Sequence, residues 1–174
     1  VPVITSVAPV PVVTSEAPAP VVSTTSEAPA PVVTSTPTST SAAPAATATA
    51  SGYMAIVDEW CVKLGRSKFN VNPTLVANAL KTAVDGNGQM VHELNPGSYG
   101  QVLAPGTPDD FLHVFVGGWL CERPALPGLD GICTTQSVGW TYEGQTGHAD
   151  IIMNADYHSI GCANSGGIWA CDFA

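Results

Sequence analysis

Four polar residues of the chain have the types and settings that suit metal binding or proton transfer. They are two histidines, a glutamine and a glutamate, namely His92, Gln101, Glu122 and His148. Neutral imidazoles bind divalent metals, and a carboxylate beside them can orient a ligand or move a proton. Each is a weak signal alone, because a lone histidine is more often a surface or hydrogen-bonded residue. A glutamate three residues after Trp119 usually lies on the solvent side of a helix.

The elements that would position these residues are helical in the first part of the domain. Apolar residues at helical spacing predict a helix over 54–64. A second helix is predicted over 72–85, with Asn72 as its N-cap and a proline in the first turn. A third is predicted over 108–119, although the Gly117-Gly118 pair weakens this prediction.

The C-terminal part has the pattern of strands. Short apolar runs at 151–153, 159–162 and 167–171 are separated by Asn, Asp and Gly. Such runs between turn residues predict short strands. Helices that come first and strands that come last indicate an α+β layered domain.

Five cysteines lie in the second part of the chain, so one remains after pairing. The pairs Cys121–Cys133 and Cys162–Cys171 would close short loops, and each disulfide would add roughly 2–4 kcal/mol to stability. Cys61 would then be free on an apolar helix face, buried and inert, with a reactive or intermolecular thiol as the alternative. No Cys-x-x-Cys spacing occurs, which argues against a zinc site built from cysteines.

Residues 1–52 differ in composition from the rest of the chain. The first 50 contain 17 Ser/Thr and nine Pro but no Lys, Arg, aromatic residue or Cys. Such a segment buries too little apolar surface to offset its ordering entropy, so we expect disorder. Thr14–Val22 returns as Thr25–Val33, and so short a proline-rich repeat favours a semi-extended linker over a solenoid. The composition is typical of an O-glycosylated stalk, with an unmodified spacer as the alternative.

Residues 53–174 are long enough for one domain with a single core. Five Lys/Arg stand against 12 Asp/Glu in this part, so we expect no nucleic-acid partner. No run approaches 18 apolar residues, so we expect no transmembrane segment. A start at Val1 instead of Met fits a processed secretory protein, which predicts an extracellular or cell-wall location.

Five short motifs follow one another along 53–174. They are Phe69–Leu75, Gly100–Ala104, Trp119 to Glu122, Gly147-His148 with the run 151–153, and Gly161-Cys162 with the closing Cys171-Asp172-Phe173. In this order and spacing the domain resembles the CAP superfamily of cysteine-rich secretory, antigen 5 and pathogenesis-related 1 proteins, and most of all its secreted fungal members. The resemblance implies that the α+β fold is a three-layer α-β-α sandwich.

The resemblance also groups His92, Gln101, Glu122 and His148 as the family's cleft tetrad, in which Gln101 replaces the first acid. A second departure from the family lies in the first helix. The family usually has a His-Asn and an Arg there, whereas this chain has Trp60, Cys61 and Leu64. In some relatives the two histidines hold a divalent metal such as zinc, which makes His92 and His148 the metal-ligand candidates. With one carboxylate lost, metal binding should be weaker, and a purely structural hydrogen-bond cluster is the competing interpretation.

Fungal relatives bind and export sterols and related lipids through an aromatic-bearing loop between the second acidic position and the Gly-His motif. The matching loop is 123–146, and its lipid-binding candidates are Leu126, Leu129, Ile132, Trp140 and Tyr142. Burial of apolar area would drive the binding of a sterol or a fatty-acid-like lipid. The alternative is that Trp140 and Tyr142 merely pack the loop onto the domain.

Catalysis is not expected. A Gly-x-Ser-x-Gly motif is missing, Cys61 has no activating partner in the sequence, and only one acid remains in the tetrad. We therefore expect a secreted, non-enzymatic CAP-type protein that binds sterols or other small lipids and requires no cofactor. The alternative is an extracellular interaction module, an effector or antigen that contacts host or cell-wall components, with a weak zinc site. A hydrolase is the least favoured interpretation.

Overall fold

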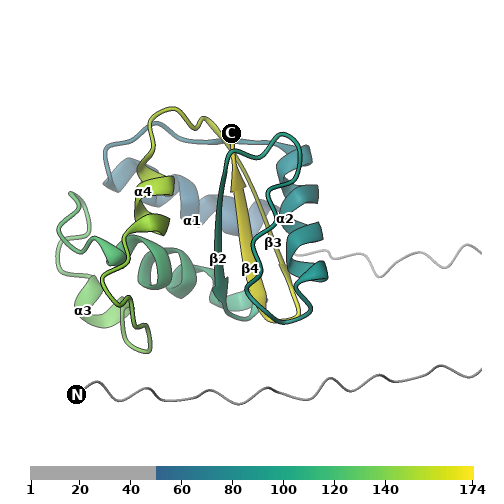
Figure 1. The fold of residues 1–174 in the computed structure, drawn as a ribbon. Coiled ribbons are helices and arrows are strands. Elements are labelled where there is room, and N and C mark those ends of the chain that lie inside the picture. Colours follow the sequence, from purple (N-terminus) through teal and green to yellow (C-terminus); the bar gives the residue numbers. More distant parts are fainter. Residues whose placement is uncertain (1–49) are drawn as a thin grey trace, which may run out of the picture. The chain divides into compact units, whose positions relative to one another are not determined.

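The computed structural model of the chain describes residues 50–174, which adopt a mixed α+β fold (Figure 1). The predicted linker lies outside the described residues except at its end, where helix α1 (Ala50–Lys63) already begins. Helix α2 (Pro73–Asp85) follows, and its N-cap Asn72 accepts a hydrogen bond from the backbone N–H of Thr74 at 2.9 Å. Both N-terminal helices are therefore as predicted, apart from the earlier start of α1.

Four strands form one sheet in the order β1-β3-β4-β2. Strand β1 (Asn70–Val71) pairs in parallel with β3 (Ser159–Ser165). Strand β4 (Ile168–Phe173) is antiparallel to both β3 and β2 (Gly100–Pro105). The two C-terminal strands are confirmed, whereas β2 was not predicted as a strand.

The prediction of a strand over 151–153 is wrong. These residues form the end of helix α4 (Gly147–Met153), in which Ile152 is fully buried and Ile151 and Met153 are partly buried. A run of three apolar residues is compatible with a buried strand or with a short helix that packs on several sides, and periodicity cannot separate the two.

The third predicted helix is present as a helical segment with an unusual winding. It comprises η1 (Pro108–Asp110), a π-helical stretch η2 (His113–Trp119) and a final turn η3 (Leu120–Glu122). The Gly117-Gly118 pair within η2 allows other parts of the chain to approach closely. A Cβ on Gly117 would lie 2.0 Å from the carbonyl oxygen of Gln136, at the end of helix α3 (Cys133–Gln136).

Helices cover both faces of the sheet (Figure 1). Because side chains alternate along a strand, each face has its own apolar cluster. One cluster joins α2 to the sheet through Ala79, Ala83, Leu103, Ala163, Ile168 and Ala170. The α2 backbone lies so close to β3 that a Cβ on Gly161 would meet the Val76 nitrogen at 2.1 Å.

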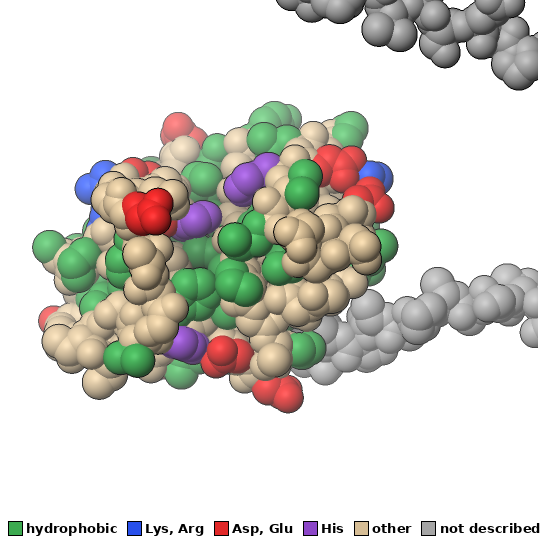
Figure 2. Space-filling model, turned by 60° about the horizontal axis from the view of Figure 1, so that its bottom comes forward, with side chains coloured by type: hydrophobic (Ala, Val, Ile, Leu, Met, Phe, Trp, Pro, Cys, Tyr) green, Lys and Arg blue, Asp and Glu red, His purple; other side chains and the backbone are tan. Residues whose placement is uncertain are grey.

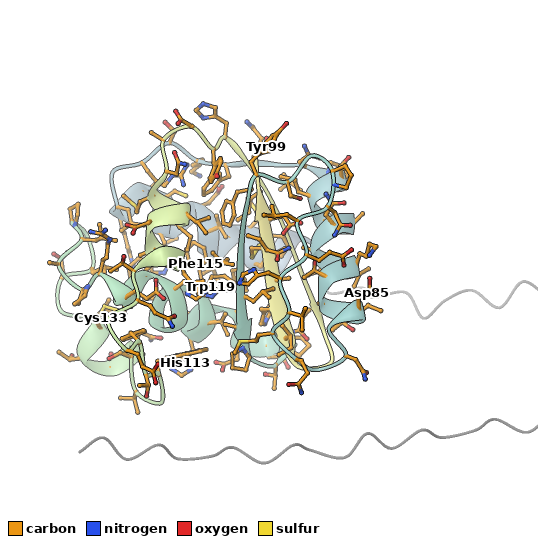
Figure 3. All side chains as sticks on the ribbon, viewed as in Figure 1. Asp85, Tyr99, His113, Phe115, Trp119 and Cys133 are labelled. Atoms are coloured by element: carbon orange, nitrogen blue, oxygen red, sulfur yellow. A yellow bond between two sulfur atoms is a disulfide. The ribbon has the colours of Figure 1, made fainter. Side chains whose placement is uncertain are left out.

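The larger cluster lies on the opposite face and joins α1, α4 and the helical segment 108–122 to the sheet. Strand residues Val102, Ile160, Trp169 and Phe173 contribute to it. Phe115 and Trp119 are fully buried there, and Figure 3 shows their positions on the helical segment beside the sheet. This face supports the elements that carry Glu122 and His148.

Two disulfides fasten the domain, and both join the expected pairs. Cys162 and Cys171 are directly opposite each other on β3 and β4, with 4.1 Å between their Cα atoms. Cys121 bonds to Cys133 and ties η3 to α3. Cys61 is unpaired and buried, as expected, and burial raises the pKa of its thiol. The two disulfides are consistent with a secreted protein.

Within residues 50–174, no helix combines the length and apolarity that crossing a bilayer would need.

Candidate functional site

His148 and Glu122 form the first half of the candidate site. The Nδ1 atom of His148 lies 2.6 Å from Oε1 of Glu122. The other carboxylate oxygen accepts the backbone N–H groups of His148, at 2.8 Å, and of Ala149, at 3.1 Å. The Glu122 side chain is only 2% exposed, so these donors replace the water that it loses on burial. The glutamate of η3 thereby holds the first turn of α4 and its histidine in place.

His92 and Gln101 form the second half. His92 lies in the loop between α2 and β2, and its Nδ1 is 2.9 Å from Oε1 of Gln101. The same oxygen accepts the backbone N–H of Glu93 at 3.1 Å. Gln101 Nε2 donates to the carbonyl oxygen of Glu93 at 2.9 Å and to Thr82 Oγ1 at 3.1 Å. Gln101 therefore anchors the loop that carries His92.

Asp172 stands behind Gln101 and was missed by the sequence analysis. Its side chain is fully buried, and its Oδ1 accepts from Gln101 Nε2 at 2.8 Å while Oδ2 accepts from Ser98 Oγ at 2.8 Å. Burial raises the pKa of Asp172, against the opposing effects of the Gln101 and Ser98 hydrogen bonds and the charge of His92. The signal was an acidic residue within an apolar strand, between Cys171 and Phe173, where an unpaired carboxylate is costly.

The tetrad residues border a cleft made of two adjacent recesses. The first, here called the histidine recess, has a volume of about 330 Å³ and is lined by His92, Gln101, Gln145, Thr146, Gly147, His148 and Ile151. The second, called the aromatic recess, has about 230 Å³ and is lined by apolar side chains that include Met90, Leu103, Pro105, Trp140 and Tyr142. Gln145 and His148 line both recesses, so the two are continuous. Figure 2 shows histidine side chains beside a hollow in which hydrophobic side chains gather.

No protein-family model matches the chain, and no curated protein does. The assignment of function therefore depends on the residues of the cleft. The cleft brings together a buried acid, two histidines and two aromatic side chains.

The lipid-binding candidates of loop 123–146 fall into two groups. Trp140 and Tyr142 line the aromatic recess, where the Tyr142 hydroxyl donates to the carbonyl oxygen of Gly117. The Trp140 ring packs on Gly118, where a Cβ would lie 3.0 Å from it. Gly118 thus leaves room for the Trp140 ring, whereas Tyr142 contacts only the backbone carbonyl of Gly117, whose missing side chain leaves room for Gln136.

The other three candidates lie elsewhere. Leu126, Leu129 and Ile132 pack against the larger apolar cluster, and Leu129 is almost fully buried. Leu129 and Ile132 line a separate hollow of about 500 Å³ with Trp60. The structure therefore does not gather the five candidates around one ligand position. Only Trp140 and Tyr142 belong to the cleft.

His92 and His148 are the metal-ligand candidates of the cleft. Each has its Nδ1 engaged by a protein acceptor, which leaves Nε2 as the ring nitrogen for a ligand, and neutral imidazoles suit zinc. In residues 50–174 no group of three or more His, Cys, Asp or Glu could hold a metal ion. His92 and His148 line the same recess, and zinc binding by this pair stays a prediction; a bound metal would be held by the two imidazoles and would supply a Lewis-acidic charge.

Proposed function

We propose that the chain is an extracellular, non-enzymatic protein of the CAP type that binds sterols or other small lipids in its cleft. The observation that carries this proposal is the aromatic recess, which places Met90, Trp140 and Tyr142 directly beside His148. Binding sites for small apolar molecules are mostly apolar hollows with a few convergent polar groups. Removal of apolar area from water would supply the affinity, at about 25 cal/mol per Å² buried.

Two features of the fold support the CAP assignment. Helices pack on both faces of the four-stranded sheet, as a three-layer α-β-α sandwich requires. The four positions assigned to the tetrad also come together as two hydrogen-bonded pairs around one cleft, although they lie far apart in sequence. The motif order along the chain is the third element of this assignment.

The size of the cleft indicates how a lipid would lie. The aromatic recess, at about 230 Å³, is smaller than the roughly 300–1,000 Å³ of pockets that enclose drug-sized ligands. A sterol would therefore extend through both recesses, with its apolar body against Trp140 and its polar end near His148. Both recesses are open to solvent.

Saturation binding of labelled ergosterol and cholesterol to the full chain tests the proposal, with unlabelled sterol and fatty acid as competitors. We expect saturable binding that unlabelled sterol competes away. Trp140→Ala and Tyr142→Ala should each weaken binding by about tenfold, because each removes a large apolar contact. Tyr99→Ala is the matched control, since Tyr99 is 72% exposed and lines neither recess. Flat titrations with a folded protein would contradict lipid binding.

A protein-interaction module is the second candidate, and one observation favours it. Met90, Val91 and Leu94 are 57%, 57% and 59% exposed in the loop that carries His92. Exposed apolar side chains that are close together are typical of a contact surface for host or cell-wall components. Two results together would support this function over lipid binding. The protein would bind no lipid, and Val91→Ser and Leu94→Ser would abolish its binding to a host or cell-wall component.

A further inference from the structure

We propose that the cleft selects ligands that carry a hydroxyl group and discriminates against ketones and anionic lipids of the same shape. This inference rests on the proposed lipid-binding function and specifies the ligand class. It follows from the hydrogen bonds of the two histidines that line the cleft, and from the placement of the basic side chains. The group recognised is an O–H donor at the polar end of an otherwise apolar ligand.

The orientation of the Gln101 amide determines the tautomer of His92. The Glu93 backbone N–H can only donate, so the amide atom it contacts at 3.1 Å is the oxygen. The opposite amide atom faces the Glu93 carbonyl oxygen and Asp172 Oδ1, both of which accept, so it is the nitrogen. Because His92 Nδ1 faces the amide oxygen at 2.9 Å, it must carry the proton. In the neutral ring, Nε2 of His92 is then an acceptor.

Glu122 determines the tautomer of His148 in the same way. Its Oε2 accepts two backbone N–H groups at the start of α4, and Oε1 faces His148 Nδ1 at 2.6 Å. A carboxylate offers only acceptors, so Nδ1 of the neutral ring is the donor and Nε2 is the acceptor. His148 lines both recesses and so stands where the polar and apolar parts of the cleft meet.

The basic side chains are all engaged away from the cleft. Lys63 pairs with Glu59, Lys68 with Asp58, Lys81 with Asp85 and Glu93, Arg123 with Asp150, and Arg66 with the backbone carbonyls of Ile152 and Tyr157. In the described part of the chain, neither recess is lined by Lys or Arg. The acids nearest to the histidines, Glu122 and Asp172, would repel a carboxylate or a sulfate. An anionic headgroup therefore finds no cation in the cleft.

The ligand class follows from these steps. A hydroxyl can donate its proton to Nε2 of His148, whereas a ketone oxygen would oppose that nitrogen lone pair and leave both groups without a hydrogen bond. A site built to bond a hydroxyl rejects the analogue that lacks it, because the polar group of the site is left unpaired. The apolar body, which is common to alcohol and ketone, would occupy the aromatic recess in either case.

Competition binding with three sterols of matched shape tests the inference on the full chain at mildly alkaline pH. The probes are 5α-cholestan-3β-ol, 5α-cholestan-3-one and cholesteryl sulfate. We expect the ketone to bind about tenfold more weakly than the alcohol, and the sulfate more weakly still. Equal affinity for alcohol and ketone, or tightest binding of the sulfate, would overturn the inference and leave lipid binding intact. No binding of any sterol would overturn both proposals.

Variants of the two cleft histidines test whether the preference for an alcohol comes from a hydrogen bond to the imidazole or from the shape of the cleft. His148→Phe and His92→Phe retain a flat ring but remove the acceptor, so we expect the preference for alcohol over ketone to fall towards onefold in His148→Phe. The backbone hydrogen bonds from residues 148 and 149 to Glu122 do not depend on the imidazole. His158→Phe is the control, since this exposed histidine lines neither recess and its preference should be unchanged. A preference that survives in both cleft variants would overturn the assignment.

Discussion

Gln101 and Asp172 lie directly opposite each other on β2 and β4, and the amide nitrogen of Gln101 donates to Oδ1 of Asp172 at 2.8 Å. The resemblance to CAP proteins had suggested that a charge is lost where glutamine replaces glutamate. The structure shows a carboxylate one hydrogen bond further from His92. A glutamate at position 101 would place its second oxygen against Asp172 and the Glu93 carbonyl, both of which are acceptors. The residues at 101 and 172 are therefore coupled.

Gln101→Glu should destabilise the protein by about 2–4 kcal/mol at neutral pH, because it buries two carboxylates side by side and leaves acceptors unpaired. Urea unfolding followed by circular dichroism measures this change. The loss should shrink at acidic pH, since protonation of either carboxyl restores a donor between the two groups.

The double variant Gln101→Glu with Asp172→Asn is the control for that interpretation. An asparagine at 172 can donate to the new carboxylate, so most of the lost stability should return. A double variant no more stable than Gln101→Glu alone would show that the two positions are not coupled.

The buried acid also predicts a pH dependence of stability. Burial raises the pKa of Asp172 above its unfolded value of about 3.9, so the folded state binds this proton more tightly than the unfolded state does. Its contribution to stability is complete below the unfolded pKa and is lost as the pH rises through the folded pKa. Asp172→Asn removes this titration and should flatten the decline in unfolding free energy over that window. An unchanged slope in the variant would assign the decline to other groups.

The sequence predicted the helices and strands that are marked by neighbouring residues, such as caps and turns. Helix α2 was found because Asn72 and the proline after it mark its start, and β3 and β4 because turn residues separate apolar runs. Strand β2 was missed because its five buried residues, Gly100–Ala104, include a glycine and a glutamine and show no alternation of apolar and polar side chains. Its strand character depends on pairing with β4, which is 60 or more residues away in the chain.

The residues of the candidate site were likewise predictable only where the sequence carries the information. His92, Gln101, Glu122 and His148 were singled out by residue type, but only the resemblance grouped them in one cleft, since no local pattern connects residues so far apart. The partner Asp172 depends on the register of β2 against β4, which sequence alone does not reveal. Leu129 was grouped with Trp140 because both lie in one loop. In the structure Leu129 is buried in the larger apolar cluster, whereas the Trp140 ring packs on Gly118.

The two disulfides should contribute similarly to stability and differently to binding. Their sequence separations are 12 and 9 residues, so loop entropy predicts a loss of about 2–3 kcal/mol when either is removed. Cys121→Ala with Cys133→Ala should also weaken sterol binding, because this bond joins η3, which carries Glu122, to the loop that carries Trp140. Cys162→Ala with Cys171→Ala should leave the affinity of the folded protein unchanged. Thermal unfolding and sterol titration of both double variants measure the two effects, and equal losses of affinity would contradict the distinction.

His113 holds the indole of Trp140 at the edge of the cleft. Its Nε2 lies 3.1 Å from Trp140 Nε1 and 3.1 Å from the carbonyl oxygen of Val138. One nitrogen cannot accept from the indole and donate to the carbonyl at the same time. The neutral ring with its proton on Nδ1, which faces Asp110 at 3.5 Å, is the form that accepts from Trp140. Figure 3 shows His113 on the same helical segment as Trp119.

His113→Phe should therefore release the Trp140 indole while preserving a ring of similar shape. We expect the Trp140 Nε1–H to exchange with solvent faster and sterol affinity to fall by a few-fold, because a less ordered ring contributes less to the bound state. Nitrogen-15 NMR of the indole N–H signals measures the exchange. Trp119 and Trp169 donate to the carbonyl oxygens of Leu103 and Thr107 and serve as internal references. Unchanged exchange at Trp140 would show that Gly118 packing alone holds the ring.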